Sequence, residues 1–222
     1  MAFNVAIDGP AGAGKSTIAK IVAKEKGFIY VDTGAMYRAM AIHFIKNGIA
    51  ADENEKISEA ADTADVTIEY INGEQQVLLN GENVTPFLRT EEVGNMASAS
   101  SVNGDVRRKL VELQKKLAAT TNVVMDGRDI GTCVLPNAQV KVYLTASVEV
   151  RAERRYKELI EKGQEADLEK IKKDIEERDY RDMNRDISPL RQAEDAVLVD
   201  SSNLNIQESA DAILALIDAK FY

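Results

Sequence analysis

Residues 9–16 read GPAGAGKS and directly follow an apolar run at residues 3–8. The spacing G-x-x-x-x-G-K-[ST] between a buried strand and a helix is typical of a phosphate-binding loop. Glycines let the backbone turn tightly, so that successive N–H groups and the N-terminus of the following helix face an anion. We therefore expect Lys15 to reach the outer phosphates of a nucleotide and Ser16 to hold magnesium. The competing interpretation is a glycine-rich turn with a chance lysine.

Strand-like and helix-like segments alternate along the chain. Short runs rich in valine and isoleucine predict strands near residues 3–8, 28–32, 122–126, 139–144 and 195–199. Helical patterns lie near residues 15–26, 35–47, 105–119, 147–162, 167–182 and 206–219. This alternation predicts an α/β fold, a parallel sheet with helices on both faces, in which ligands bind beyond the carboxyl ends of the strands.

One segment departs from this alternation. Residues 66–80 read VTIEYINGEQQVLLN, in which two strand-like runs flank Asn72-Gly73. Asn-Gly between two such runs is a strong hairpin signal. We expect an antiparallel insertion at residues 63–102 and a second irregular, arginine-rich stretch at residues 163–191.

Composition limits the classes of function. The chain has 222 residues, a formal net charge of −9 and one cysteine, which argues against a broad nucleic-acid surface and rules out an intrachain disulfide. No apolar run approaches the ~20 residues that span a bilayer, and no secretory signal is visible. We therefore expect a cytoplasmic protein with no membrane and no nucleic-acid partner.

The motif DTGAMYR at residues 32–38 follows the second predicted strand. Arg38 lies in the first turns of a helix, where its guanidinium can grip a second phosphate with two hydrogen bonds. A plain helix start, capped by Asp32 or Thr33 with Arg38 in solvent, explains the pattern equally well.

The motif DGRDIGT at residues 126–132 follows the third predicted strand. An aspartate at the end of a buried strand, in a chain with a phosphate-binding loop, resembles a Walker B element that orders magnesium. The alternative is a turn in which Asp126 caps the backbone and Arg128 pairs with Asp129.

The run RDYRDMNR at residues 178–185 combines four charged positions at helical spacing. Arg178, Arg181, Asp182 and Arg185 are three or four residues apart and share one helix face. Several guanidiniums beside one carboxylate suit a transferring phosphoryl group. Salt bridges within the helix, worth roughly tenths of a kcal/mol, explain the same spacing.

Together these motifs resemble the bacterial cytidylate kinase family. The resemblance rests on GPAGAGKS, DTGAMYR, VGNMASASSV, DGRDIGT, RDYRDMNR and DSSNLN, and it covers essentially the whole chain. It implies a P-loop kinase fold with a five-stranded parallel sheet flanked by helices. Residues 1–62 and 103–222 would form the core, 63–102 an antiparallel monophosphate-binding insertion, and about 154–185 a short lid. The implied enzyme is a monomer that transfers the γ-phosphoryl group of ATP, with Mg²⁺, to CMP or dCMP.

The resemblance also implies roles for individual residues. Expected ATP-binding residues are Gly9, Pro10, Ala11, Gly12, Ala13, Gly14, Lys15, Ser16, Thr17 and Arg154, with Arg151 and Arg155 as further lid candidates. Expected acceptor-binding residues are Thr33, Arg38, Ser98, Arg107, Arg128, Asp129, Arg178, Asp182 and Arg185. The catalytic residues would be Lys15, Arg128, Arg178 and Arg185, and Ser16 would bind Mg²⁺ with Asp126 behind it.

Cytosine recognition is expected from three of these residues. Asp129 would accept a hydrogen bond from the 4-amino group, and Arg107 would donate to the acceptor atoms of the ring. Ser98 would also contact the cytosine edge. Asp182 would lie near the ribose hydroxyls. Thr33 stands where some family members carry serine, and its hydroxyl is retained.

Two alternatives remain at this point. One is a P-loop kinase for another small molecule. However, the kinases specific for sugars or organic acids are shorter and would not need the insertion at residues 63–102. The other is a nucleotide-switch GTPase, which requires an N-K-x-D motif that is absent from the chain.

Overall fold

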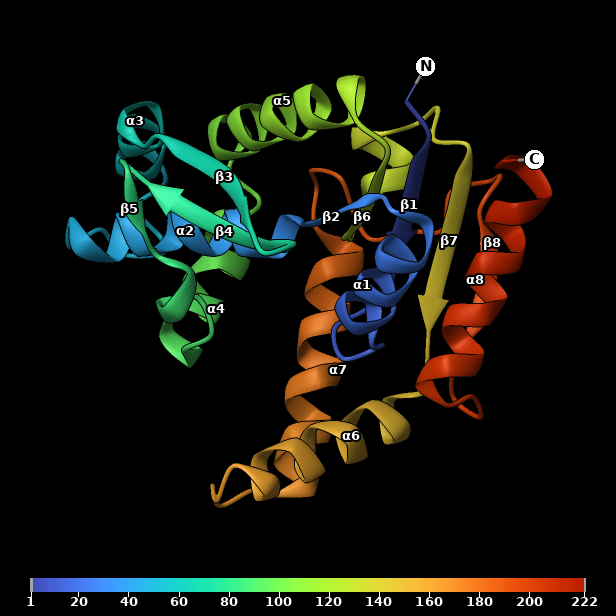
Figure 1. The fold of residues 1–222 in the computed structure, drawn as a ribbon. Helices are drawn as coiled ribbons and strands as arrows, with labels where there is room; N and C mark the ends of the chain where they lie inside the picture. Colours follow the sequence, from blue (N-terminus) through green and yellow to red (C-terminus); the bar gives the residue numbers. More distant parts are fainter. Residues whose placement is uncertain (1, 222) are drawn as a thin grey trace. The chain divides into compact units, whose positions relative to one another are not determined.

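The computed structural model describes residues 2–221 and has an α/β architecture, as predicted (Figure 1). The strands are β1 (Asn4–Asp8), β2 (Ile29–Asp32), β3 (Val66–Ile71), β4 (Glu74–Leu79), β5 (Glu82–Asn83), β6 (Val123–Gly127), β7 (Val140–Thr145) and β8 (Val197–Asp200). The helices are α1 (Lys15–Lys26), α2 (Thr33–Lys46), α3 (Asn54–Thr63), α4 (Glu91–Ser100), α5 (Gly104–Thr120), α6 (Val148–Glu161), α7 (Leu168–Asn184) and α8 (Ile206–Phe221). A short 3₁₀ helix spans Thr85–Phe87, and a π-helical turn spans Ile130–Val134.

Contacts between residues divide the chain into two compact units. The first unit comprises Met1–Tyr30 and Thr121–Tyr222, and the second comprises Val31–Thr120. The five-stranded sheet has the order β2-β6-β1-β7-β8, and β1 pairs in parallel with both β6 and β7. All five strands predicted for this sheet are confirmed, with bounds shifted by one or two residues.

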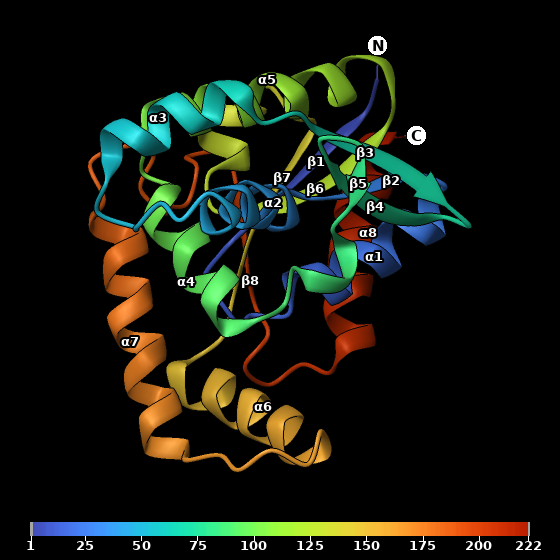
Figure 2. The same cartoon turned by 90° about the vertical axis from the view of Figure 1, so that its left-hand side faces the viewer.

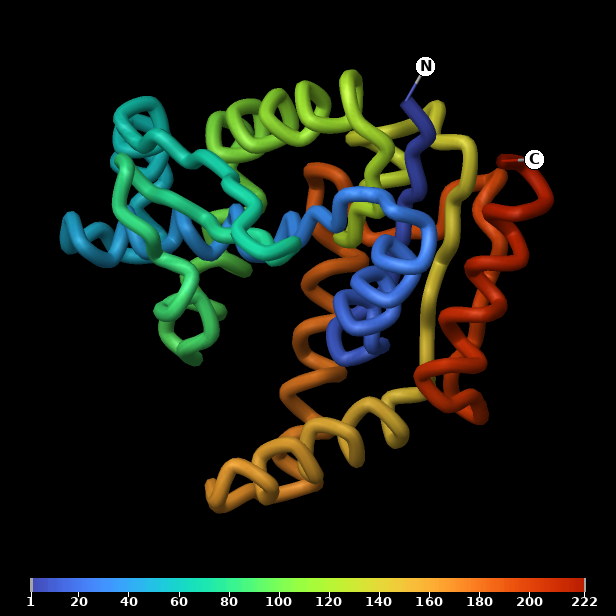
Figure 3. The backbone as a smooth tube through the Cα atoms, viewed as in Figure 1, coloured from blue at the N-terminus to red at the C-terminus, as the bar shows by residue number. Residues whose placement is uncertain are grey.

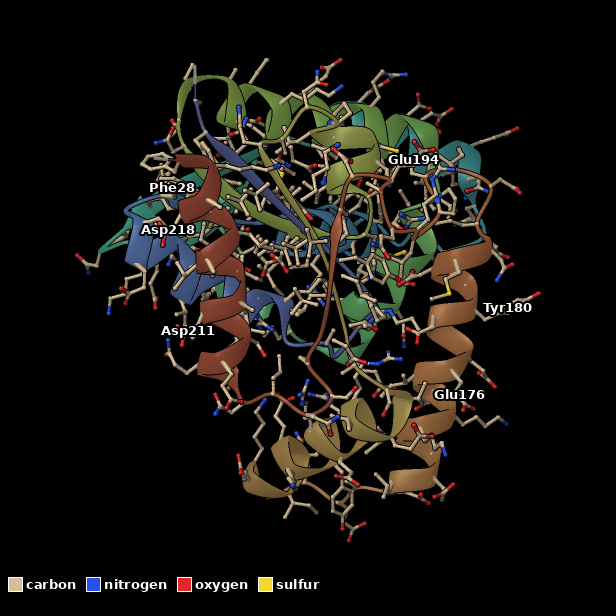
Figure 4. The ribbon with its side chains drawn as sticks, turned by 90° about the vertical axis from the view of Figure 1, so that its right-hand side faces the viewer. Phe28, Glu176, Tyr180, Glu194, Asp211 and Asp218 are labelled. Atoms are coloured by element: carbon tan, nitrogen blue, oxygen red, sulfur yellow. The ribbon has the colours of Figure 1, made fainter. Side chains whose placement is uncertain are left out.

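The core of the first unit lies on the face of the sheet covered by α1 and α8. Strand side chains two residues apart point to the same face, and Val5, Ile7 and Val124 all face these helices. Ile18 and Val22 of α1 fill the same cluster, as do Ile213 and Ile217 of α8. Figure 4 labels Asp211 and Asp218 on α8; both residues are exposed, and Asp218 pairs with Lys26 at the end of α1. The helix is thus amphipathic, with its apolar stripe against the sheet.

Helices α6 and α7 form a helical hairpin in the first unit. The chain leaves β7, follows α6, turns at Gly163 and returns along α7, a path that Figure 3 traces as a continuous tube. The two helices contact each other and lie at a steep angle to one another in Figures 1 and 2. Residues 163–191, expected to be irregular, are therefore mainly helical, in agreement with the helix predicted at 167–182.

The second unit contains a three-stranded antiparallel sheet in the order β3-β4-β5. The predicted hairpin is confirmed, since Ile71 pairs with Glu74 across a turn in which Asn72 and Gly73 have φ angles of 53° and 80°. Positive φ at both positions gives a turn whose twist matches that of the strands. Helix α2 packs against α4, and α3 packs against α5, which lies beside it in Figures 1 and 2.

Two helices of the second unit had no counterpart among the sequence predictions. Helix α4 lies inside the stretch treated as an antiparallel insertion, and α3 precedes it. The start of α4 carries a local signal that was overlooked, because the Thr90 hydroxyl caps the Val93 amide and Glu91 and Glu92 occupy the first turn.

Candidate active site

The register of the sheet brings two of the sequence motifs to one edge. Ile7 pairs with Asp126, and Asp8 pairs with Gly127, in adjacent parallel strands. The GPAGAGKS loop and the DGRDIGT loop therefore begin side by side at the carboxyl ends of β1 and β6. This is the edge at which ligands bind in open α/β sheets.

The GPAGAGKS loop requires glycine at both of its ends. A Cβ atom on Gly9 would lie 1.9 Å from the Leu144 carbonyl oxygen, so no other residue fits there without moving β7. Gly14 has φ of 87° as the N-cap of α1, a left-handed conformation that strains other residues. The loop thus passes close to β7 and leads directly into the N-terminus of α1. A helix N-terminus at the end of such a loop is a typical anion-binding site.

Lys15 is buried beneath this loop, with 6% of its surface exposed. Its Nζ atom donates a hydrogen bond of 2.7 Å to the Pro10 carbonyl. Burial, aided by the nearby charge of Arg128, lowers the pKa of Lys15 to about 7, against the opposing effect of Asp126. A buried ammonium with so low a pKa is strongly stabilised by any anion that enters the loop.

Ser16 and Asp126 meet at the start of α1. The Ser16 hydroxyl donates a 3.0 Å hydrogen bond to Asp126 Oδ2, and the Tyr30 hydroxyl donates one of 2.9 Å to Asp126 Oδ1. Tyr30 was not among the predicted site residues, because its pairing with a position 96 residues away depends on the order of β2 and β6. Two hard oxygen donors side by side suit Mg²⁺, which uses one or two protein groups and completes its shell with water and phosphate oxygens. Among residues 2–221 no cluster of three or more His, Cys, Asp or Glu side chains is arranged to hold a metal.

Asp8 connects the two loops and was also missed by the sequence analysis. Its carboxylate accepts hydrogen bonds of 2.7 Å from the amides of both Ile130 and Gly131. Burial raises the pKa of Asp8 to about 6, although these two amides act to lower it. Asp8 therefore fixes the start of the π-helical turn that follows Arg128 and Asp129.

Arginines from two elements converge around Asp182 on α7. Arg128 Nε donates a 2.8 Å hydrogen bond to Asp182 Oδ2, and Arg185 Nη2 lies 3.9 Å from Asp129 Oδ1. Burial acts to raise the pKa of Asp182, but the charges of Arg128, Arg178 and Arg185 outweigh it and hold the pKa below its ordinary value. Three predicted catalytic arginines are thus gathered about one carboxylate.

This cluster decides between two earlier alternatives. Arg128 pairs with Asp182, so the turn in which it would pair with Asp129 is not formed. Arg181, placed by its spacing on the same face of α7, is exposed and donates to the Glu177 carbonyl instead. The buried positions of this part of α7 are Asp179 and Asp182, and Arg185 is the C-cap residue rather than part of the helix.

The lid candidates of α6 lie in different surroundings. Arg154 donates from Nη2 to the Ser201 carbonyl at 2.7 Å and from Nη1 to the Ser201 hydroxyl at 3.3 Å, which ties it to the DSSNLN segment. Arg155 is exposed and pairs with Glu158 at 2.8 Å on the same helix. Arg151 is buried beside the GPAGAGKS loop.

The second unit carries the remaining predicted residues. The Asp32 carboxylate caps α2 by accepting from the Ala35 amide at 2.9 Å, and Thr33 is buried as the first residue of the helix. The Gln75 side chain of β4 accepts from the Asp32 amide at 2.8 Å and donates to the Asp32 carbonyl at 3.2 Å. The antiparallel sheet thereby holds the start of the DTGAMYR helix, and Arg38 lies one turn further along it.

Arg107 and Ser98 lie on the helices of the second unit. Arg107 on α5 is buried, with its guanidinium carbon 6.0 Å from the centroid of the Tyr37 ring. A planar cation over an aromatic face is held in orientation as well as in position. Ser98 is partly buried on α4, where its carbonyl accepts from the Ser101 hydroxyl at 2.9 Å.

No helix within residues 2–221 has the length and apolar character needed to cross a bilayer.

Comparison with known proteins identifies the family of the chain. The family model described as "Cytidylate kinase" matches residues 5–219. A cytidylate kinase from Caldicellulosiruptor saccharolyticus is 51% identical over 214 residues, covering 96% of this chain and 95% of the relative. A cytidylate kinase from Bacillus subtilis is 46% identical over 218 residues, covering 98% and 97%. Among solved structures, an uncharacterized protein from Eubacterium ventriosum has a TM-score of 0.54 at 11% identity, covering 99% of each chain, which is a likeness of fold alone. The chain therefore belongs to the cytidylate kinase family.

Proposed function

We propose that the protein transfers the γ-phosphoryl group of ATP to CMP or dCMP, producing ADP and CDP or dCDP. An oxygen of the acceptor phosphate forms the new bond to the γ-phosphorus, and the bond from that phosphorus to the bridging oxygen of ADP breaks. The attacking oxygen needs no dedicated base, because a phosphate monoester with a second pKa of about 6 is already ionised at neutral pH.

The observation that carries this proposal is the set of cations in the first unit. Lys15 lies under the GPAGAGKS loop, and Arg128, Arg178 and Arg185 surround Asp182. Phosphoryl transfer requires positioning and charge neutralisation more than covalent help from the protein. In our proposal Lys15 and the loop amides bind the ATP phosphates, and the three arginines bind the acceptor phosphate and the transferring group.

Mg²⁺ belongs to this proposal as the partner of ATP. Ser16 would hold the ion, and Asp126, which accepts the Ser16 hydrogen bond, would orient the hydroxyl and the ion's water. When bound, the ion neutralises charge on the ATP phosphates. Arg154, adjacent to the Ser201 backbone, is proposed to lie on the nucleotide-donor side.

The acceptor nucleotide would be bound by the residues that the family resemblance implies. We assign Thr33 and Arg38 to the acceptor phosphate, Ser98, Arg107 and Asp129 to the cytosine edge, and Asp182 to the ribose. Residues 63–102 would act as the monophosphate-binding insertion and about 154–185 as the lid of a core formed by the rest of the chain.

A panel of nucleoside monophosphates, each tested as acceptor with ATP and magnesium, tests the proposal. We expect ADP release that depends on CMP or dCMP, with UMP much weaker and purine monophosphates inactive. ADP release that is independent of any acceptor would contradict a kinase, and preference for a sugar or an organic acid would indicate a different acceptor class.

A further inference from the structure

A buried ion pair joins the two helices of the α6–α7 hairpin. Arg151 on α6 is 3% exposed and Asp179 on α7 is 9% exposed. Their contact is bidentate, with Nη1 donating to Oδ1 at 3.1 Å and Nη2 donating to Oδ2 at 2.6 Å. Figure 4 shows the next residue, Tyr180, pointing outward from α7, and its side chain is 69% exposed. The arginine–aspartate pair therefore occupies the inner side of the hairpin.

The same guanidinium reaches the GPAGAGKS loop. Arg151 Nη1 donates a 3.0 Å hydrogen bond to the Ala11 carbonyl, and Nε donates one of 2.9 Å to the Ala146 carbonyl. Its aliphatic stem lies against Gly12, where an added Cβ atom would be 3.4 Å from Arg151 Cβ. Four of the five N–H groups of the side chain are thus engaged within the protein.

This contact sets the direction of a loop amide. In a trans peptide the carbonyl and the following N–H point in opposite directions. Because the Ala11 carbonyl is turned toward Arg151, the Gly12 N–H points away from α6. The amides of such a loop bind phosphate only when their N–H groups converge, so the arginine constrains the part of the loop that must face the nucleotide.

Asp179 links this contact to the arginine cluster. It lies on the same helix as Asp182, which holds Arg128 through a 2.8 Å hydrogen bond. One helix therefore carries two carboxylates, one bound to the loop through Arg151 and one bound to Arg128. Movement of α7 alters both connections together.

We propose that Arg151 is a positioning residue, held by Asp179, that sets the Ala11–Gly12 peptide for the triphosphate of the donor nucleotide and couples it to the position of α7. Arg151 acts through the loop and does not itself bind the nucleotide. This inference rests on the ATP-binding role proposed above for the loop.

Asp179→Asn and Arg151→Lys test the proposal. The amide keeps the size of Asp179 but loses its charge, and lysine keeps the charge of Arg151 but lacks the planar fork that binds both Asp179 oxygens and the Ala11 carbonyl. Each variant should raise KM for ATP by about 10- to 100-fold, the range for loss of a hydrogen bond to a charged group. KM for CMP should stay within about threefold, and the double variant should be no worse than the more affected single variant, since both act through one contact.

The pair between Glu149 on α6, which is exposed, and Lys172 on α7, which is half-buried, supplies the matched control. Its atoms are 3.2 Å apart and it joins the same two helices without touching the loop. Glu149→Gln should leave both KM values unchanged. If it raised KM for ATP as much as Asp179→Asn, general hairpin stability would explain the result and the proposal would be overturned.

Inorganic tripolyphosphate separates positioning from direct contact. Its competition against ATP should weaken in the variants by the same factor as ATP itself, because it tests only the phosphate loop. If the variants bound ATP more weakly but tripolyphosphate equally well, Arg151 would act on the nucleoside part of ATP, and the proposal would be refuted. Lower melting temperature with unchanged binding would make the pair merely structural.

The binding readout also separates this inference from the proposed function. Failure of the wild-type protein to phosphorylate CMP would refute the kinase assignment, whereas tripolyphosphate binding to the variants would still decide the role of Arg151. If Asp179→Asn does not fold, as judged by circular dichroism, Arg151→Lys decides the question alone.

Discussion

At the scale of single residues, Lys15 is a buried cation whose charge depends on what occupies the loop. Burial and Arg128 lower its pKa to about 7 in the free protein. Lys15 is therefore fully protonated well below pH 7 and loses its charge as the pH rises above 7. The phosphates of ATP favour the charged form and raise the pKa again.

ATP binding at pH 8 should consequently take up a proton at Lys15, because the γ-phosphate is already ionised there. The affinity for ATP should fall as the pH rises above about 7. Titration calorimetry with a non-hydrolysable ATP analogue, in buffers of different ionisation enthalpy, measures the proton number. Lys15→Met should abolish the uptake, and Lys15→Ala should lower kcat by about 10²-fold or more while the fold is retained. Equal uptake in the wild-type protein and Lys15→Met would assign the proton to another group.

Asp129 is the residue on which base choice should depend. Cytosine offers an amino hydrogen to its carboxylate, whereas uracil presents an oxygen. A hydrogen bond to a charged group contributes roughly 1.5–3 kcal/mol. Asp129→Ala should therefore lower the ratio of kcat/KM for CMP over UMP by about 10- to 100-fold.

A competing role for Asp129 is visible in the structure. Its carboxylate lies 3.9 Å from Arg185 Nη2, so it can orient an arginine that we propose to be catalytic. In that case Asp129→Ala would lower kcat/KM for both acceptors equally, and the ratio would not move. Arg107 and Ser98 would then have to read the base.

At the scale of elements, the antiparallel sheet of the second unit supports the helix that carries Thr33 and Arg38. Gln75 of β4 makes two hydrogen bonds to the backbone of Asp32, the N-cap of α2. Each neutral hydrogen bond contributes roughly 0.5–1.5 kcal/mol. Gln75→Leu should raise KM for CMP roughly tenfold and leave KM for ATP within about twofold.

Gln76, the next residue of β4, provides the control for that variant. Its side chain accepts from Asn83 at 3.1 Å and does not reach Asp32. Gln76→Leu should have no effect on KM for CMP. Equal effects from both substitutions would show that the sheet matters only through its stability.

At the scale of the whole molecule, we expect two segments to be ordered by bound nucleotides. Phosphoryl transfer is protected from hydrolysis when water is excluded from the site. Residues 63–102 and 163–191 should therefore gain protection from hydrogen exchange in the presence of CMP and a non-hydrolysable ATP analogue. The strands β1 and β6, already buried, serve as the internal reference. Absence of added protection in both segments would exclude a closing lid.

The features that could be predicted from the sequence are those that local chemistry controls. The strand–loop–helix at residues 3–26 depends on glycines and apolar residues that are neighbours in the chain. The hairpin at Asn72-Gly73 depends on two adjacent residues that accept positive φ. The alternation of strands and helices depends on periodicity within each segment, and it predicted all five strands of the large sheet. Two short helices, α3 and α4, lacked a long enough pattern to be distinguished from loops.

Which side chains meet depends on how the elements pack in three dimensions. Asp8 accepts from amides 122 and 123 residues away, Tyr30 donates to Asp126, and Arg151 joins the Ala11 carbonyl to Asp179. No spacing in the sequence predicts these pairings, because each contact follows from strand order and register or from the packing of α6 on α7. Arg128 illustrates the limit: its neighbour in sequence is Asp129, but its partner is Asp182, brought to it by the fold. Motifs specify chemistry through residues close in the chain, whereas the buried pairs that hold them in place are specified by the packing of elements far apart in it.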